Sequence, residues 1–187
     1  MKILLIDNYD SFTYNIVHYV EGFDNEVDVC YNTEIPLDKI MEYDKVILSP
    51  GPGLPVEAGQ LNEFIKRFNG KIPILGICLG FQALTEFYGG KLINQVEVKH
   101  GIKENCFFDT ESKLFLNTSK QFQIGLYHSW AADIKAFPNQ LKVTAQSEND
   151  VIMAFEHVVF PVFGVQFHPE SIMTDYGLTI IENFLSI

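Results

Sequence analysis

The sequence predicts an α/β protein with a doubly wound, mostly parallel sheet that is flanked by helices and extended by a small antiparallel part. Three observations lead to this prediction. Short apolar runs recur without alternating polar residues, amphipathic stretches lie between the first of them, and polar or glycine-rich segments follow where runs end. Strands and helices in this order join through right-handed crossovers, which gather the functional loops at the carboxyl ends of the strands.

Four apolar runs are expected to form the buried strands of this sheet. Unbroken runs of this length suit strands that are covered on both faces, because a half-exposed strand would alternate apolar and polar residues. The runs are residues 3–6, 46–48, 74–77 and 162–167.

Amphipathic stretches between the runs are expected to form helices. The first, residues 12–20, has an apolar stripe at helical spacing, and Asp10 or Ser11 can serve as its N-cap. The second, residues 61–68, has a similar stripe and is followed by an Asn-Gly pair, which is typical of a helix end. Two further helices are expected at residues 79–87 and 175–185.

Beyond Gly90 the pattern changes to shorter strands separated by polar turns, which favours an antiparallel extension of the sheet. We expect one domain over residues 1–187, since this length suits a single domain and 47% apolar residues can form a substantial core. The expected strands of the extension are residues 91–98, 106–109, 121–124, 141–146 and 151–155.

Charge and cysteine content narrow the classes of function. The net charge is −11, from 13 basic and 24 acidic residues, which argues against nucleic acid or an anionic membrane as the main partner. The three cysteines are odd in number and have no Cys-x-x-Cys spacing, so we expect neither a disulfide framework nor a zinc site. The first apolar run is too short for a signal sequence and no run reaches about 18 residues, so we expect a cytoplasmic protein that does not span a membrane.

Cys78 is the strongest candidate for a nucleophile. It lies in Gly-Ile-Cys-Leu-Gly, residues 76–80, where an apolar strand gives way to a helix. The two glycines permit a sharp turn that holds a nucleophile at an exposed, strained apex, and the helix N-terminus favours negative charge on the sulfur. The alternative is that a cysteine between small residues is only a small apolar side chain of the core.

His168 is expected at the same edge of the sheet, because it follows the last apolar run. In an extended chain, residues two apart project to the same side, which would put Glu170 beside the imidazole. A carboxylate that orients an imidazole, which in turn activates a nucleophile, is the logic of a catalytic triad. Without Cys78, a strand-end histidine paired with a surface glutamate would be the simpler interpretation.

A Ser-Pro-Gly-Pro-Gly segment, residues 49–53, follows another buried strand. Its prolines and glycines predict a rigid turn with exposed backbone N–H groups, which suits an oxyanion or a carboxylate. Most such turns are only turns. The oxyanion-hole interpretation depends on a second donor, the N–H of Leu79 next to the candidate nucleophile.

Two further polar segments could contribute to a site at this edge. Residues 7–15 can cap a helix or line a site, and they lack the glycine-rich fingerprint of a dinucleotide-binding fold. Residues 127–130, Tyr-His-Ser-Trp, are expected to form a loop that either recognises a small polar substrate or packs as an aromatic corner. We interpret His18, His100 and His157 as non-catalytic, because they lack ligand spacing.

Together these motifs resemble the class I glutamine amidotransferase family, and more narrowly the small glutaminase subunit shared by anthranilate synthase and aminodeoxychorismate (para-aminobenzoate) synthase. They occur in family order along essentially the whole chain, and the resemblance implies the fold of that family. The segments that carry it are residues 7–15, 49–53, 76–82, 100–101, 127–129 and 166–171.

The resemblance also implies roles for individual residues. By position, Cys78 is the nucleophile, His168 is its base and later acid, and Glu170 is the carboxylate that orients the histidine. The backbone at Gly53 and Leu79 corresponds to the oxyanion hole. Glutamine would be held by Gly51, Pro52 and Gly53 of the turn and by Gln82, Ser129 and the backbone of Trp130.

Three residues depart from the family pattern. Phe81 stands where histidine is usual, Leu126 where arginine commonly precedes the tyrosine, and Trp130 where leucine is frequent. None of them is a triad residue, so they bear on partner contacts and on the fit around glutamine.

The resemblance implies that the protein hydrolyses L-glutamine through a cysteine thioester, without a cofactor, and passes the ammonia to a chorismate-binding synthase subunit. Ammonia protonates near neutral pH and then ceases to be a nucleophile, so a docked synthase is expected to complete the site. Two alternatives stay open: a stand-alone hydrolase of glutamyl amides, and a catalytically silent regulatory module on the same fold. The residues do not decide between the anthranilate and aminodeoxychorismate branches.

Overall fold

A computed structural model describes the backbone of residues 1–187 and every side chain except those of residues 96–98. The strands are β1 (Lys2–Asp7), β2 (Glu26–Tyr31), β3 (Lys45–Leu48), β4 (Ile74–Ile77), β5 (Leu92–Phe108), β6 (Gln121–Ala132), β7 (Leu141–Ser147), β8 (Ile152–His157) and β9 (Val162–Val165). The helices are α1 (Thr13–Glu21), α2 (Leu61–Phe68), α3 (Leu79–Phe87) and α4 (Gly177–Ser186). Short 3₁₀ turns lie at Ile40–Glu42, Pro55–Glu57, Lys113–Phe115 and Ile134–Ala136.

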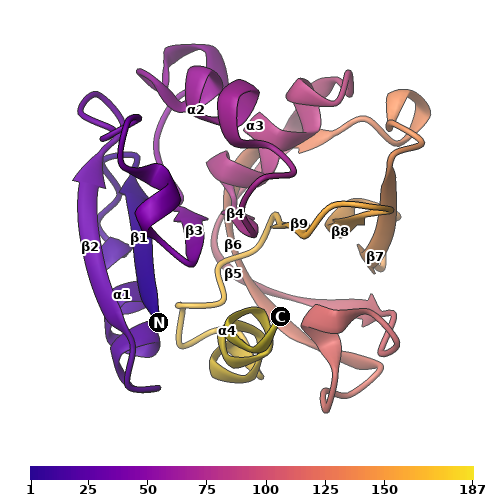
Figure 1. Ribbon diagram of the computed structural model, residues 1–187. Coiled ribbons are helices and arrows are strands. Elements are labelled where there is room, and N and C mark those ends of the chain that lie inside the picture. The colour runs from indigo at the N-terminus through magenta and orange to yellow at the C-terminus, as the bar shows by residue number, and fades with distance from the viewer.

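All strands belong to one nine-stranded sheet with the order β2-β1-β3-β4-β9-β8-β7-β5-β6. Figure 1 shows helices α1 and α4 on one face of this sheet and α2 and α3 on the other. The first five strands of that order are parallel, and the remaining pairings are antiparallel. The predicted α/β fold class is therefore confirmed.

The parallel half of the sheet contains the strands that the apolar runs predicted. β4 lies between β3 and β9 and is fully buried. Ile77 at the end of β4 is opposite Val165 at the end of β9. The chain segments that leave these two strands therefore begin next to one another at the carboxyl edge of the sheet.

The sequence prediction omitted the edge strand β2. Its sequence, Glu-Val-Asp-Val-Cys-Tyr, alternates polar and apolar residues, and its side chains are half-buried or exposed. β2 pairs only with β1 and has no strand on its other side. An unbroken apolar run was the pattern sought for buried strands, so a half-exposed strand escaped it.

The antiparallel part has longer strands than predicted. The expected strands at residues 91–98 and 106–109 overlap the two ends of the single strand β5, and the expected strand at residues 121–124 is the first part of β6, which continues to Ala132. Register shifts interrupt the pairing of β5 with β6, and Gly101 within one of them has a φ of +70°. Bulges of this kind break the alternation by which a long strand is recognised.

The predicted loop at Tyr127-His128-Ser129-Trp130 is wrong, because these residues lie in the middle of β6. A loop was predicted because polar residues of this kind are common in turns and loops. In the structure, His128 is buried, and Tyr127, Ser129 and Trp130 are half-buried.

Helix α1 starts without the predicted cap. Phe12 occupies the N-cap position, and its side chain makes no capping hydrogen bond. Asp10 acts one step earlier, since its Oδ2 atom accepts a hydrogen bond of 2.7 Å from the Phe12 N–H. The prediction of Asp10 or Ser11 as N-cap is therefore wrong, and Asp10 stabilises the turn that precedes the helix.

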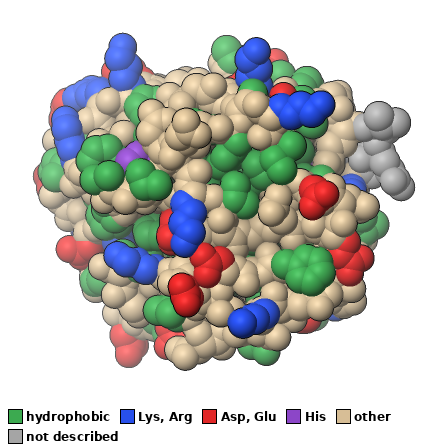
Figure 2. Space-filling view, turned by 90° about the vertical axis from the view of Figure 1, so that its right-hand side faces the viewer, with side chains coloured by type: hydrophobic (Ala, Val, Ile, Leu, Met, Phe, Trp, Pro, Cys, Tyr) green, Lys and Arg blue, Asp and Glu red, His purple; other side chains and the backbone are tan. Residues whose placement is uncertain are grey.

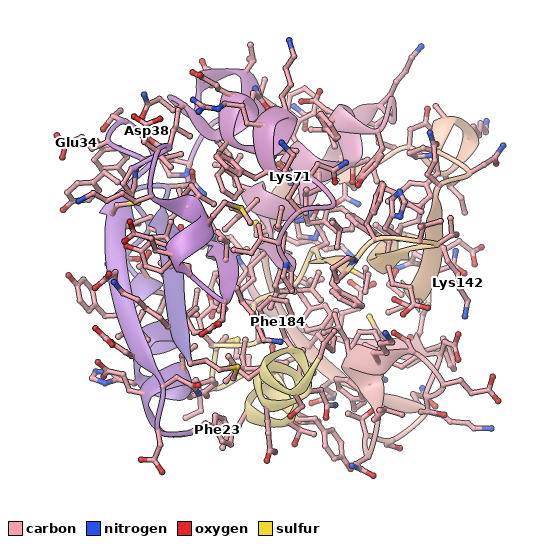
Figure 3. The ribbon with its side chains drawn as sticks, in the orientation of Figure 1. Phe23, Glu34, Asp38, Lys71, Lys142 and Phe184 are labelled. Atoms are coloured by element: carbon pink, nitrogen blue, oxygen red, sulfur yellow. The ribbon has the colours of Figure 1, made fainter. Side chains whose placement is uncertain are left out.

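The buried side chains form two clusters, one on each face of the sheet. Phe184 projects from α4 toward the sheet (Figure 3), where its ring lies 6.3 Å from that of Phe163 on β9. On the other face, the Phe81 ring of α3 lies 5.0 Å from that of Phe155 on β8. Phe81 and Leu126 are fully buried, so these two departures from the family pattern belong to the core.

The surface near β7 and β8 has a mixed character. Figure 2 shows acidic and basic side chains interspersed with hydrophobic patches, without a continuous basic patch among the side chains that it colours. Lys142 on β7, for example, lies 2.8 Å from Asp109. Among the helices that the structure describes, none has the length and apolar character that crossing a bilayer requires.

Candidate active site

Cys78 lies at a sharp turn between β4 and α3. Its φ of +50° and ψ of −97° lie outside the backbone regions that L-residues favour. The Cys78 N–H donates to the Val165 carbonyl over 2.8 Å, and the Cys78 carbonyl accepts from the Gln82 N–H over 3.0 Å. These hydrogen bonds hold the residue in the strained conformation that the sequence predicted.

The two glycines beside Cys78 allow three elements to approach one another. A Cβ atom added to Gly76 would lie 2.5 Å from the carbonyl carbon of Gly80. A Cβ atom added to Gly80 would lie 2.7 Å from the Cβ atom of Leu48 on β3. Because real Cβ atoms do not come this close to other atoms, larger residues here would push α3 away from the sheet.

Cys78 is buried, with only 6% of its surface exposed, so the prediction of an exposed apex is wrong. The residue is reached through a cavity of about 320 Å³. Residues 9–12 and 50–52 line this cavity together with His168, which confirms that the predicted loops meet at one edge of the sheet. A small polar molecule can therefore approach the sulfur from one side.

His168 and Glu170 form a buried pair. The Nδ1 atom of His168 lies 2.6 Å from Oε1 of Glu170. A turn brings them together, in place of the predicted extended chain: the Ser171 N–H donates to the His168 carbonyl over 3.2 Å, and the Thr174 hydroxyl donates to it over 2.6 Å. The pairing was predicted correctly, but its predicted geometry is wrong.

The other imidazole nitrogen of His168 is available for proton transfer. A carboxylate that accepts from Nδ1–H leaves the lone pair of the neutral ring on Nε2. Nε2 is buried and has no hydrogen-bond partner among the described residues. Burial lowers the pKa of His168, but interactions with Cys78 and Glu170 outweigh it and raise that pKa well above its ordinary value.

The other two cysteines have surroundings that keep the thiol protonated. Burial, together with nearby carboxylates, raises the pKa of Cys30 to about 12. Burial also raises the pKa of Cys106 far above its ordinary value. A protonated thiol is a poor nucleophile, so the structure leaves Cys78 as the cysteine suited to reaction.

The Pro-Gly turn after β3 is held against the first loop. Ser49 Oγ accepts a hydrogen bond of 2.8 Å from the Asn8 N–H, and the Asn8 side-chain amide donates to the Ser49 carbonyl over 2.8 Å. A Cβ atom on Gly51 would lie 2.5 Å from the Cβ atom of Asn8. This close approach explains why residue 51 is glycine, and it fixes one wall of the cavity.

The residues assigned to substrate binding by resemblance fall into two groups. Gly51 and Pro52 line the cavity beside Cys78. Gly53, Leu79, Gln82, Ser129 and Trp130 are not among the described residues that line it. Gly53 has the φ of +77° that a left-handed turn requires, and the N–H of Leu79 begins α3, where it has no partner within the helix. The roles of both groups stay predictions.

Three residues to which the sequence interpretation gave no role of their own lie at this site. His100 and Tyr127 line the cavity, and their rings lie 5.4 Å apart with an edge-to-face geometry. Gln166 donates from Nε2 to the Cys78 sulfur over 3.5 Å. Tyr127 and Gln166 lie within motifs in which neighbouring residues were assigned the roles. His100 was interpreted as non-catalytic because it has no metal-ligand spacing.

The comparisons with known proteins agree along the whole chain. A family model described as glutamine amidotransferase class-I matches residues 4–187. Anthranilate synthase component 2 of Lactococcus lactis is 44% identical over 186 residues, which are 98% of this chain and 93% of that protein. Aminodeoxychorismate/anthranilate synthase component 2 of Bacillus subtilis is 42% identical over 185 residues, which are 98% of this chain and 95% of that protein.

Fold likeness and fused relatives add to these matches. A glutamine amidotransferase from Thermotoga maritima has a crystal structure that matches with a TM-score of 0.75 at 20% identity, covering 91% of this chain and 76% of that one. The chain is also 40% identical over 190 residues to the bifunctional protein TrpGD of Thermotoga maritima. This match covers 100% of this chain and 32% of that protein's length. A domain of this kind thus occurs both alone and fused to others.

Proposed function

The chain belongs to the class I glutamine amidotransferase family, and from this premise we propose that it is the glutaminase subunit of a chorismate-amidating synthase. Its substrate is L-glutamine, and its catalytic residues are Cys78, His168 and Glu170. The observation that carries this proposal is the buried pair of His168 and Glu170, 2.6 Å apart, at the same cavity as the strained Cys78.

The reaction begins when the Cys78 thiolate attacks the side-chain amide carbon of glutamine. A carbon–sulfur bond forms, and the carbonyl electrons move onto oxygen. His168 then donates its Nε2 proton to the amide nitrogen, the carbon–nitrogen bond breaks, and ammonia departs. Water attacks the resulting glutamyl thioester while His168 takes up its proton, and glutamate is released with the thiolate restored.

Two backbone groups are suited to the developing oxyanion. The N–H of Leu79 follows the nucleophile directly and has no intrahelical acceptor, because it begins α3. Gly53, in the turn whose neighbours line the cavity, would supply the second donor. Donors fixed in place before the reaction stabilise the transition state without reorganising, which is why rigid turns suit this role.

Gln82 is suited to bind the substrate through its oxygen. Its Nε2 atom already donates to the Trp130 carbonyl and to Gln166. Among the described residues, its Oε1 atom has no hydrogen-bond donor. A hydrogen-bond donor on the substrate, such as its ammonium group, could donate to this Oε1 atom.

A partner protein is needed to use the ammonia that is released in this cavity. Free ammonia is protonated near neutral pH and is then unreactive, so a chorismate-binding synthase subunit that covers the cavity would receive it before it reaches water. The names of the relatives from Lactococcus lactis and Bacillus subtilis include both anthranilate and aminodeoxychorismate synthases. We propose one of these two synthases as the partner.

The decisive experiment replaces Cys78 with alanine in the reconstituted pair of subunits. We expect glutamine-dependent synthesis from chorismate to vanish, while synthesis from added ammonia persists. Cys30→Ala is the matched control, because Cys30 lies away from the cavity and its thiol stays protonated. If the Cys78→Ala pair still uses glutamine, the assignment of the nucleophile is wrong.

A second experiment separates the amidotransferase from a silent module and from a stand-alone hydrolase. An electrophilic glutamine analogue should add to the protein once, and peptide mass spectrometry should place the adduct on Cys78. The absence of an adduct would favour a silent module. Full turnover of glutamine by the isolated chain, unchanged by a synthase, would favour the stand-alone hydrolase.

A further inference from the structure

A chain of hydrogen bonds lies behind the Cys78 sulfur. The carbonyl oxygen of Trp130 accepts from Gln82 Nε2 over 3.1 Å and lies 2.9 Å from Nδ1 of His128. Gln82 Nε2 also donates to Gln166 Oε1 over 3.2 Å. Gln166 Nε2 in turn donates to the Cys78 sulfur over 3.5 Å. The chain connects the backbone of β6 to the nucleophile through two side-chain amides.

The Trp130 carbonyl fixes the direction of this chain. A carbonyl oxygen can only accept, so Gln82 must turn its NH₂ group toward Trp130. The same NH₂ group reaches Gln166, which must then present its oxygen to Gln82 and its NH₂ group to Cys78. If the Gln166 amide were reversed, it would present its NH₂ group to that of Gln82, and the sulfur would face an oxygen.

Burial makes this direction costly to change. The side chains of Gln82 and Gln166 are buried, and Gln166 has no exposed surface. Burial also lowers the pKa of His128 to about 4, so its ring is neutral at neutral pH and its Nδ1–H donates to the Trp130 carbonyl. Because these groups are buried, water has little access to replace a lost hydrogen bond. A buried polar group without a partner is strongly unfavourable, so reversing either amide would cost stability.

We infer that Gln166 is a positioning residue that stabilises the reactive thiolate of Cys78 by donating an N–H hydrogen bond to its sulfur. A charged acceptor binds an N–H donor more strongly than a neutral thiol does, so this donor favours the thiolate. Gln82 and the Trp130 carbonyl hold the donor in the required orientation. The inference deepens the proposed function and rests on it for the reaction, whereas the effect on the sulfur is a property of the free protein.

The test measures alkylation of Cys78 by iodoacetamide as a function of pH. Gln166→Met keeps an unbranched side chain of similar length and removes the donor. We expect the midpoint of the rate profile to move to higher pH by about one unit, so that alkylation at pH values below the wild-type midpoint is about tenfold slower. Peptide mass spectrometry assigns the label to Cys78. Gln146→Met, on β7 and away from the cavity, is the matched control.

A second variant keeps the shape of the side chain. Gln166→Glu replaces the amide donor with a carboxyl group, which as a carboxylate would repel the thiolate, and we expect alkylation at least as slow as in Gln166→Met. Circular dichroism and thermal unfolding establish that each variant is folded, and Gln166→Glu supplies the test if Gln166→Met does not fold. A folded variant that alkylates with the wild-type profile overturns the inference.

Glutamine hydrolysis, assayed with the synthase present, separates the inference from the proposed function. We expect kcat of Gln166→Met to fall about tenfold, in parallel with the alkylation rate. If alkylation slows but even the wild-type protein releases no ammonia from glutamine, the role of Gln166 stands and the proposed function fails. If hydrolysis is lost while alkylation is unchanged, the inference is wrong and the proposed function stands.

Discussion

Glu170 Oε1 accepts a hydrogen bond from Nδ1 of His168 over 2.6 Å, inside a turn in which the Ser171 N–H and the Thr174 hydroxyl both donate to the His168 carbonyl. The carboxylate holds the proton on Nδ1, so Nε2 can accept a proton from one group and return it to another. Both side chains are buried, so water cannot take over this orienting role.

Replacing Glu170 with glutamine should reduce kcat for glutamine by about 10²- to 10⁴-fold, because the amide can present a donor to the imidazole and select the wrong tautomer. KM should change little, since Glu170 is not predicted to contact glutamine. Steady-state kinetics of the reconstituted complex measure both constants. Glu182→Gln, an exposed change on α4, is the control. An unchanged kcat would remove Glu170 from the proposed triad.

Replacing Gly80 with alanine should lower the free energy of unfolding by about 1–3 kcal/mol. The new Cβ atom would lie 2.7 Å from both the Cβ atom and the carbonyl oxygen of Leu48, so α3 must move away from β3. Urea denaturation measures the change. Gly22→Ala is the control, because its φ of −59° suits alanine and its Cβ atom would meet nothing nearer than 3.3 Å. Equal losses in both variants would contradict the packing argument.

The parallel half of the fold could be predicted because its strands are buried on both faces. The apolar runs of β1, β3, β4 and β9 are direct consequences of that burial. The half-exposed edge strand β2 gives no such run. The bulges of β5 hide a 17-residue strand behind two shorter patterns. Long-range pairing and bulges decide these elements, and neither leaves a local signal.

The candidate site shows the same limit. Gly76 and Gly80 predict a sharp backbone turn at Cys78, and the structure has that turn. The contact of Gln166 with Cys78 spans 88 positions, so no local pattern could reveal it. The burial of Cys78 also could not be read locally, because the segments that cover it come from distant parts of the chain.

Replacing Phe81 with histidine should lower the free energy of unfolding by about 1–3 kcal/mol. Phe81 is fully buried, its ring packs against Phe155, and a polar imidazole there would lack the hydrogen bonds it has in water. Urea denaturation again measures the effect. Phe87→His, at an exposed position on the same helix, should cost much less. Equal losses of unfolding free energy in Phe81→His and Phe87→His would contradict this prediction, because they would show that the core supplies the buried imidazole with a hydrogen-bond partner.

His128 makes the stability of the protein depend on pH. Burial lowers its pKa to about 4, and its Nε2 atom has no hydrogen-bond partner among the described residues. The folded protein therefore resists protonation of this ring, whereas the unfolded chain takes up the proton near the ordinary pKa of about 6.5. Between these two values the unfolded state binds more protons, so stability falls as the pH decreases.

The shift of the His128 pKa corresponds to about 3 kcal/mol of stability that is present above pH 6.5 and lost on acidification to pH 4. In His128→Gln, which cannot titrate, the free energy of unfolding should decrease by about 3 kcal/mol less than in the wild-type protein over this range. Urea denaturation at pH 7, 5 and 4 measures the difference, and carboxylates that titrate in both proteins cancel from it. The same pH dependence in both proteins would contradict this prediction, because it would mean that the folded protein takes up the His128 proton at the ordinary pKa.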